Sequence, residues 1–248
     1  MMTHRCTRRM AFTLALCAAA AVPLAAQTAA TATLPPINSA SIVQGLTRWR
    51  LTALRDTMQR DLGVMTRELH FTSHDGQPAV LLVSTFPTPN GTILDSALAI
   101  RATLAPVWQH SHQPTKMLML NFSASGVTGT ITPADSAPRV VHSELGARVF
   151  DATWLGVLIP ALPLAKGYTS LLPGYTVETG KIEFATVAVT GASTLPVAGQ
   201  PRPVWVVRYA DPYIVNTYLV DQDTHVVRRE EIHPRAGGSL LMVPVTAS

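Results

Sequence analysis

Residues 152–175, ATWLGVLIPALPLAKGYTSLLPGY, decide how the rest of the chain is interpreted. The segment carries no charge from Thr153 to Ala165, whereas the chain around it consists of short alternating runs and turns. Its apolar part is shorter than the roughly 20 residues that a membrane-spanning helix needs. We therefore expect a short buried helix that begins after an Asp151 N-cap. Pro160 and Pro163 should end it quickly.

Most of the remaining chain is typical of short β-strands. Asp75-Gly76 and Asn90-Gly91 are the residue pairs favoured in two-residue hairpins. Further turns are expected at 221–223, and residues 197–203 (VAGQPRP) are expected to form a loop. Strands with turns about every ten residues predict a mostly β protein: a curved antiparallel sheet or half-open β-barrel with one short covering helix.

The N-terminus has the features of a secretory signal. Arg5, Arg8 and Arg9 precede an apolar run at residues 10–22, and small residues follow at Ala25-Ala26. We predict a signal peptide at 1–26, a flexible leader at 27–41 and a single β-rich domain at 42–248. A retained membrane anchor is the competing interpretation. We expect a periplasmic or secreted protein with no transmembrane segment after cleavage.

Cleavage would change the charge and the cysteine content. The signal holds three of the 19 basic residues and no acidic one, so the formal charge falls from +4 to +1. This small charge argues against a nucleic-acid partner. Cys6 and Cys17 are the two cysteines of the chain, and the mature part has neither. It can therefore form no disulfide or thiolate metal site, and lipidation at Cys17 stays open.

The order of several short segments resembles uncharacterised exported bacterial β-sheet proteins that are similar in fold to periplasmic lipoprotein-sorting carriers. The resemblance covers roughly residues 92–232. It implies an open half-barrel with a helix over its mouth, and it implies no catalytic residue or lipoprotein cargo. The segments are TILDS (92–96), LAPVW (104–108), VTGT (127–130), 155–164 followed by Gly167-Tyr168, WVV (205–207), YLVD (218–221) and THVVRRE (224–230).

Several polar groups are candidate sites. His110 and His112 lie on the same side of a strand, as metal ligands could, but no third ligand is identifiable nearby, so solvent-facing histidines are the simpler interpretation. Asp221 and Asp223 lack the further ligands of a calcium loop and fit a turn. The run 228–231 (RREE) is expected to be a solvated strand face. We predict no metal, no cofactor and no catalytic residue.

The remaining hypotheses concern an apolar ligand. Aromatic side chains could line a pocket, although they could equally fill an ordinary core. We favour a non-enzymatic exported protein that holds a lipid or acyl chain in a half-barrel cavity, gated by movement of the helix. An envelope structural or interaction protein with a partner at a sheet edge is the alternative, and a hydrolase is a third hypothesis. The residues expected to bind the ligand are Trp154, Leu155, Leu158, Ile159 and Trp205.

Overall fold

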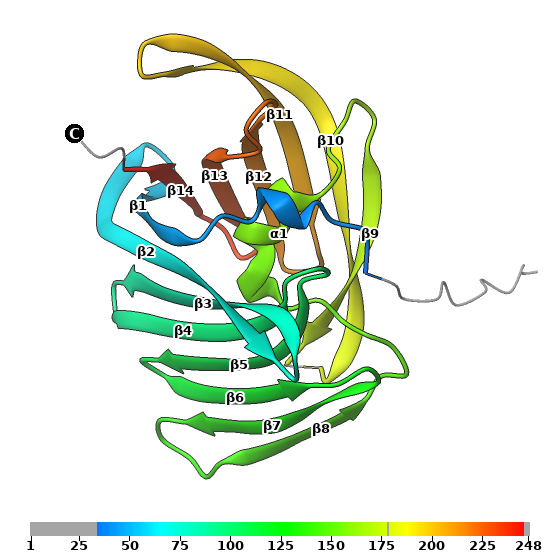
Figure 1. Ribbon diagram of the computed structural model, residues 1–248. Coiled ribbons are helices and arrows are strands. Elements are labelled where there is room, and N and C mark those ends of the chain that lie inside the picture. The colour runs from blue at the N-terminus through cyan, green and yellow to red at the C-terminus, as the bar shows by residue number, and fades with distance from the viewer. Residues whose placement is uncertain (1–33, 178, 246–248) are drawn as a thin grey trace, which may run out of the picture. The chain divides into compact units, whose positions relative to one another are not determined.

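The computed structural model describes residues 34–177 and 179–245, and these form one 14-stranded antiparallel sheet with a short helix in its concave face (Figure 1). The prediction of a mostly β protein built on a curved, open sheet is confirmed. The predicted signal peptide lies outside the described residues. The strands are β1 (Gly45–Arg55), β2 (Met58–His74), β3 (Gln77–Thr88), β4 (Gly91–Ile100), β5 (Ala105–Gln113), β6 (Lys116–Phe122), β7 (Gly126–Pro133), β8 (Arg139–Glu144), β9 (Thr169–Thr176), β10 (Lys181–Val197), β11 (Gln200–Ala210), β12 (Ile214–Asp221), β13 (Val227–Pro234) and β14 (Ser239–Pro244).

Tight turns connect most neighbouring strands. Asp75 and Gly76 have φ values of 48° and 74°, which is the left-handed backbone that a two-residue hairpin requires. The prediction of a loop at 197–203 is wrong. Ala198 and Gly199 instead form a two-residue hairpin turn, with φ values of 49° and 76°. β10 and β11 consequently continue to either side of that turn. The prolines of this segment hid the strands from a sequence-based prediction.

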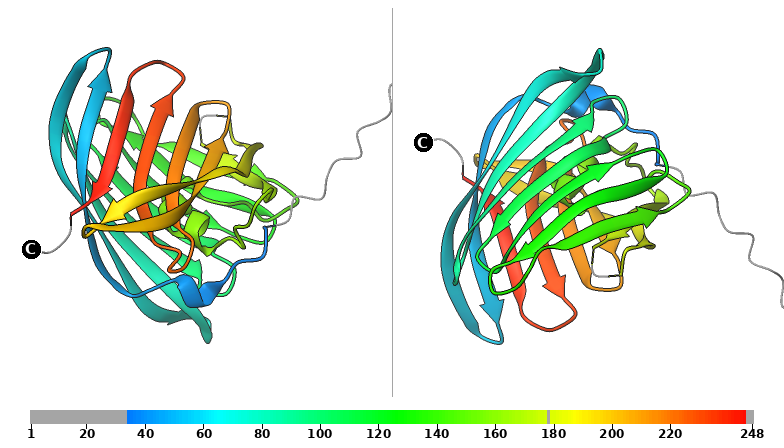
Figure 2. Two further views of the ribbon diagram at one scale, coloured as in Figure 1. Left: turned by 90° about the horizontal axis from the view of Figure 1, so that it is seen from above. Right: turned by 90° about the horizontal axis from the view of Figure 1, so that it is seen from below.

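The strand order explains how the sheet surrounds the helix. Strands β1 to β8 follow one another across the sheet, and β9 to β14 do the same, with β1 paired to β14 where the two halves join. This leaves β8 and β9 at the two edges. The chain returns from β8 to β9 through the concave side, and the views in Figure 2 show the strands curving around this connection. One link to β9 is the parallel bridge between Phe150 and Gly174.

The connection contains the predicted helix. A 3₁₀ turn, η2 (Ala152–Trp154), leads directly into α1 (Leu155–Ala161). Asp151 is the N-cap of η2, as predicted, and its side chain accepts a hydrogen bond from the backbone N–H of Thr153. The helix includes Pro160 and ends one residue later, where the N–H of Leu162 still bonds back to Leu158 and Ile159.

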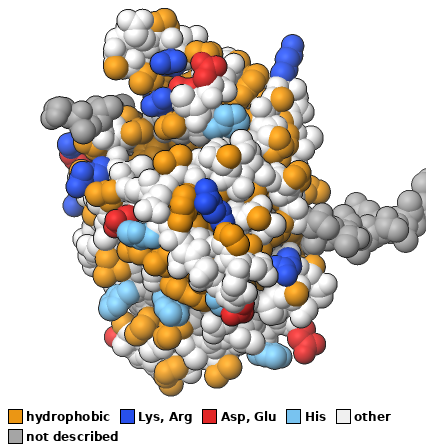
Figure 3. Space-filling model, viewed as in Figure 1, with side chains coloured by type: hydrophobic (Ala, Val, Ile, Leu, Met, Phe, Trp, Pro, Cys, Tyr) orange, Lys and Arg blue, Asp and Glu red, His pale blue; other side chains and the backbone are white. Residues whose placement is uncertain are grey.

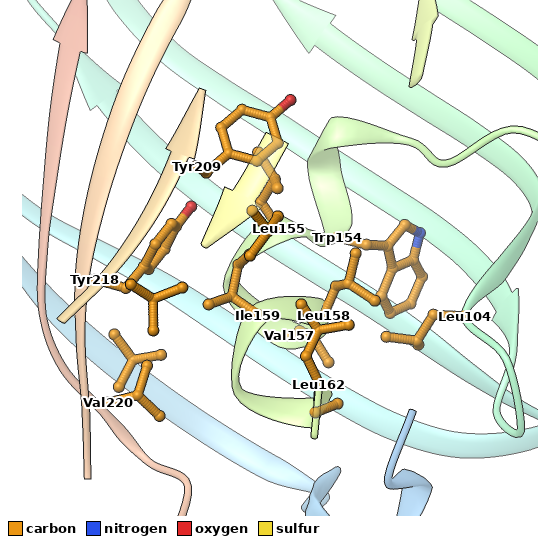
Figure 4. Packing of buried hydrophobic residues seen from close by; sticks show 14 of the residues in the cluster. Leu104, Trp154, Leu155, Val157, Leu158, Ile159, Leu162, Tyr209, Tyr218 and Val220 are labelled. Atoms are coloured by element: carbon orange, nitrogen blue, oxygen red, sulfur yellow. The ribbon is translucent and has the colours of Figure 1, made fainter. Parts of the chain in front are cut away.

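The main hydrophobic core consists of α1 and the inner faces of the strands around it. Trp154, Leu158 and Ile159 are buried among residues from both halves of the sheet, including Leu104, Tyr209 and Tyr218 (Figure 4). Full burial of a large apolar side chain contributes about 1.5–3 kcal/mol. The helix is therefore a major part of the core, rather than a cover laid on its outside.

The second half of the predicted leader also contacts α1. Residues 34–41 include the 3₁₀ turn η1 (Ser39–Ser41), and Leu34 and Ile37 pack against the core. The backbone N–H of Asn38 donates to the carbonyl of Ala161 at 2.7 Å, so this segment is attached to the end of the helix. Within the described part of the chain, neither the length nor the apolar character of any helix is sufficient for it to span a membrane.

Candidate functional site

A row of polar side chains crosses the inner face of β2 to β5. The strand register places Arg67 opposite Ser84, Ser84 opposite Asp95, and Asp95 opposite Ser111. Residues that lie directly opposite one another on neighbouring strands share a face of the sheet. Ser84 and Ser111 are buried, so the row faces the interior and the helix. Figure 4 shows the apolar packing around α1.

The start of the helical segment is fixed next to the row. Asp151 Oδ1 accepts the hydrogen bond from the Thr153 N–H at 3.0 Å, and Gln109 Nε2 donates to Thr153 Oγ1 at 2.6 Å. The other oxygen of Asp151, Oδ2, is buried and has no hydrogen-bond partner among the described residues. The same is true of Asp95 Oδ1. A buried acceptor without a donor is costly, and such atoms in native proteins call for an explanation.

Burial changes the proton affinity of both carboxyl groups. It raises the pKa of Asp151 from 3.8 to about 6, although the hydrogen bonds from Thr153 act in the opposite direction and nearby Asp95 adds to the rise. Burial also raises the pKa of Asp95, and a hydrogen bond with Ser111 partly offsets this. A ligand group that donates a hydrogen bond, or carries a positive charge, would stabilise these carboxylates.

Two cavities lie next to this segment, and Ala152 and Thr153 line both. The first has a volume of about 240 Å³ and is bounded by β5 and β6 on one side and by β9 to β11 on the other. Asp151 faces it, together with Gln109 and several aromatic side chains. These aromatic residues are Phe122, Phe150, Tyr175, Tyr209 and Tyr213.

The second cavity, of about 270 Å³, holds Arg67, Asp95 and Glu230 within mostly apolar walls. Burial raises the pKa of Glu230, and the positive charge of Arg67 works against that rise. Asn216 Nδ2 donates to Glu230 Oε1 at 3.3 Å and to the hydroxyl of Tyr218 at 3.0 Å. Both cavities therefore combine apolar walls with a few convergent polar groups, which is the usual composition of small-molecule sites.

The five residues predicted to bind a ligand all belong to the main hydrophobic core or pack against it. Trp154, Leu155, Leu158 and Ile159 are all buried in the main core. Leu155 also borders the second cavity. Trp205 on β11 is partly buried and packs against the same core. Ligand binding by these five side chains stays a prediction.

The sequence did not lead us to predict that charged side chains such as Arg67 and Glu230 face the interior. Arg67 alternates with buried Met65 and Leu69, and this spacing of two could have assigned it to the inner face. The run 228–231 was predicted to be a solvated strand face, and that prediction is wrong for Glu230, whose side chain is 5% exposed. Successive residues of a strand face opposite sides of the sheet. A run of four charged residues therefore places about two of them on the inner side, where the core lies.

The other predicted polar groups have structural roles. Asp221 forms the expected turn: its Oδ1 accepts from the N–H groups of Asp223 and Thr224, and Arg228 bonds to its Oδ2 at 3.0 Å. His110 and His112 point outward from β5, as expected of solvent-facing histidines. Across residues 34–177 and 179–245, no three His, Cys, Asp or Glu side chains are grouped to hold a metal ion.

Comparison with known proteins assigns a family. The family described as "Protein of unknown function (DUF3108)" matches residues 58–231, which is more than two thirds of the chain. The chain belongs to this family. The matched region of the DUF3108 family includes the polar residues of both cavities, from Arg67 to Glu230. A search of curated proteins found no match.

Proposed function

We propose that this DUF3108 protein is an exported, non-enzymatic binding protein, and that it holds a ligand with an apolar body in the cavity beside Asp151. Two observations carry the proposal: Asp151 lines a cavity walled by aromatic side chains, and its buried Oδ2 has no hydrogen-bond partner among the described residues. The apolar body would lie against the aromatic walls, and a hydroxyl or ammonium group of the ligand would donate to Asp151. The sequence-based hypothesis that residues 92–232 share the fold of lipoprotein-sorting carriers points to the same class of function, whereas the family match itself names no function.

The size of the cavity limits what it can hold without a change in the protein. An engineered cavity of about 150 Å³ in a protein core binds benzene. The volume of about 240 Å³ therefore accepts a group somewhat larger than one aromatic ring, such as one end of a lipid. A complete acyl chain needs additional space, which an outward movement of α1 would provide.

Few polar contacts hold the C-terminal end of α1. The carbonyl of Ala161 accepts from Asn38, and the carbonyl of Pro160 lies 3.0 Å from Nδ1 of His225. An opening movement would break these bonds and expose the apolar side chains of the helix. Trp154, Leu155, Leu158, Ile159 and Trp205 would then contact the ligand, as the sequence-based hypothesis expects.

The test begins with native mass spectrometry of the mature protein purified from its own periplasm. Additional mass that matches a lipid or another amphipathic molecule supports the proposal. Ala185 lines the first cavity from β10, so Ala185→Leu should occupy part of it and lower the uptake of a fluorescent alkylamine or fatty alcohol at least tenfold. Thr186→Leu is the matched control, because this neighbouring side chain is exposed on the opposite face of the strand.

The results also separate the proposal from its alternatives. Equal uptake by the two variants, or no uptake by the wild type, would contradict binding in this cavity. The envelope interaction protein is the second candidate, because β8 and β9 are the edge strands of the sheet and Val140 on β8 is 75% exposed. A protein that carries no ligand and takes up neither probe would favour this candidate. Turnover of simple esters would instead revive the hydrolase hypothesis.

A further inference from the structure

Four side chains that can bind soft metal ions meet on the outer face of the β5–β6 hairpin. The strand register places His110 directly opposite Met119, and His112 directly opposite Met117. Directly opposed residues have Cβ atoms about 4.5–5.5 Å apart, and the two residues of each pair on one strand are separated by about 7 Å. The four side chains therefore start from the corners of a small rectangle. Each is long enough to bring a nitrogen or sulfur atom toward its centre.

The side chains lie on the solvent side of the sheet. Ser111 and Leu118, which alternate with them, are buried on the inner face. Met117 and Met119 are 43% and 45% exposed. The four residues line a shallow groove of about 310 Å³ together with Leu94 and Ser96 of β4. In Figure 3, histidine side chains lie among hydrophobic ones in the lower part of the view, where Figure 1 has the strands that follow β4.

Packing does not account for the two methionines. Methionine is usually among the more buried residue types. The core contacts of β6 are made by Leu118 and Leu120, which point to the other face of the strand. Two exposed thioethers, each opposite an exposed imidazole, form a pattern that neither the sheet nor the core requires. The sequence showed only the histidine pair, because the methionines become neighbours through strand pairing.

The chemistry of the four donors selects one class of ion. Thioether sulfur is a soft ligand that favours Cu(I), and imidazole nitrogen also suits copper. All four donors are uncharged when the imidazoles are neutral, which matches a monovalent ion better than a divalent one. Zinc sites instead draw on thiolate, imidazole or carboxylate ligands. We propose that His110, His112, Met117 and Met119 form a binding site for a Cu(I) ion on the outer face of the sheet.

A nearby tryptophan provides a direct readout. The ring of Trp108 stacks on the imidazole of His110, with centroids 4.6 Å apart and an angle of 29° between the rings. A copper ion on His110 would lie close to this indole and quench its fluorescence. Trp108→Phe should remove that part of the quenching and leave the amount of bound copper unchanged.

The experiment uses the mature protein without an affinity tag. Cu(I) is supplied anaerobically in competition with bicinchoninate, and Ag(I) serves as a monovalent ion that does not change its redox state under these conditions. We expect one Cu(I) ion per chain. We also expect the Met117→Leu/Met119→Leu double variant to bind it at least tenfold more weakly. His110→Gln should weaken binding similarly, because each change removes donor atoms from the site.

Matched controls separate the site from general effects. Met58→Leu changes another exposed methionine, on β2, and His142→Gln changes an exposed histidine on β8, so both should bind Cu(I) like the wild type. Circular dichroism and thermal unfolding confirm that each variant is folded. Three results would overturn the proposal: no bound Cu(I), binding that survives the loss of both methionines, or tighter binding of Zn(II) than of Cu(I). The test is independent of the interior cavity, because Ala185→Leu should not change copper binding.

Discussion

Asp151→Asn should remove a specific part of the pH dependence of folding. Burial raises the pKa of Asp151 from 3.8 to about 6 in the folded protein. The folded state therefore holds this proton more tightly than the unfolded state does. Through this group, the free energy of unfolding falls as the pH rises from about 4 to about 6, and it stays constant above that range. The effect follows from the charged carboxylate being buried next to Asp95 without a donor for Oδ2.

The magnitude follows from the difference in pKa. About two pH units between the folded and unfolded values correspond to about 3 kcal/mol. Asparagine keeps an oxygen for the Thr153 N–H and is as good an N-cap as aspartate, but it cannot ionise. The unfolded carboxyl is already partly ionised at pH 4, so relative to the wild type the variant should gain about 2.5 kcal/mol in stability between pH 4 and pH 7. A constant cost of the new amide group would shift both values and leave this gain unchanged.

Urea unfolding of the two proteins at several pH values from 4 to 7 measures the effect. Asp61→Asn provides a control whose effect should hardly change over this pH range. The pKa of Asp61 is lowered from 3.8, first by the Gly63 N–H and then, against the effect of desolvation, by Arg50, so its contribution to stability is present above about pH 4 and is lost only as the pH falls below 3.8. If Asp151→Asn and the wild type show the same change in unfolding free energy from pH 4 to pH 7, Asp151 is not buried as an ionised group. The unpaired Oδ2 would then give no reason to expect a ligand at this carboxylate.

Three further predictions concern stability. Gly129→Ala should lower the free energy of unfolding, measured by chemical denaturation, by on the order of 3 kcal/mol or more, because a Cβ would lie 1.9 Å from the carbonyl oxygen of Met119. A variant as stable as the wild type would contradict this close approach of β7 to β6. Arg67→Leu should lower the free energy of unfolding by on the order of 3 kcal/mol near neutral pH, since it removes the cation beside buried Glu230. This loss should be smaller when Glu230→Gln is added. An equal loss in both backgrounds would show that the two charges do not interact. Trp154→Ala should cost about 3–5 kcal/mol, and an unchanged unfolding midpoint would mean that α1 leaves the core easily.

The local chemistry of the sequence determined the elements and the fold class. Asp75-Gly76 predicts its hairpin because few other residues accept positive φ so readily. The uncharged segment after Asp151 predicts a buried helix because an apolar run requires burial and aspartate satisfies the first free N–H groups. These are interactions between residues a few positions apart, and the sequence displays them directly. The prolines near Ala198 misled the same reasoning, since they usually mark loops.

Only the tertiary structure determined which distant residues meet. Arg67, Asp95 and Glu230 lie on separate strands, and they surround one cavity because strand register and sheet curvature bring those positions together. The pairing of His110 with Met119 depends in the same way on the register between β5 and β6. A shift of one residue would turn each of these side chains to the other face of the sheet. The packing of the whole molecule selects the register, so residue type and spacing alone could not reveal either candidate site.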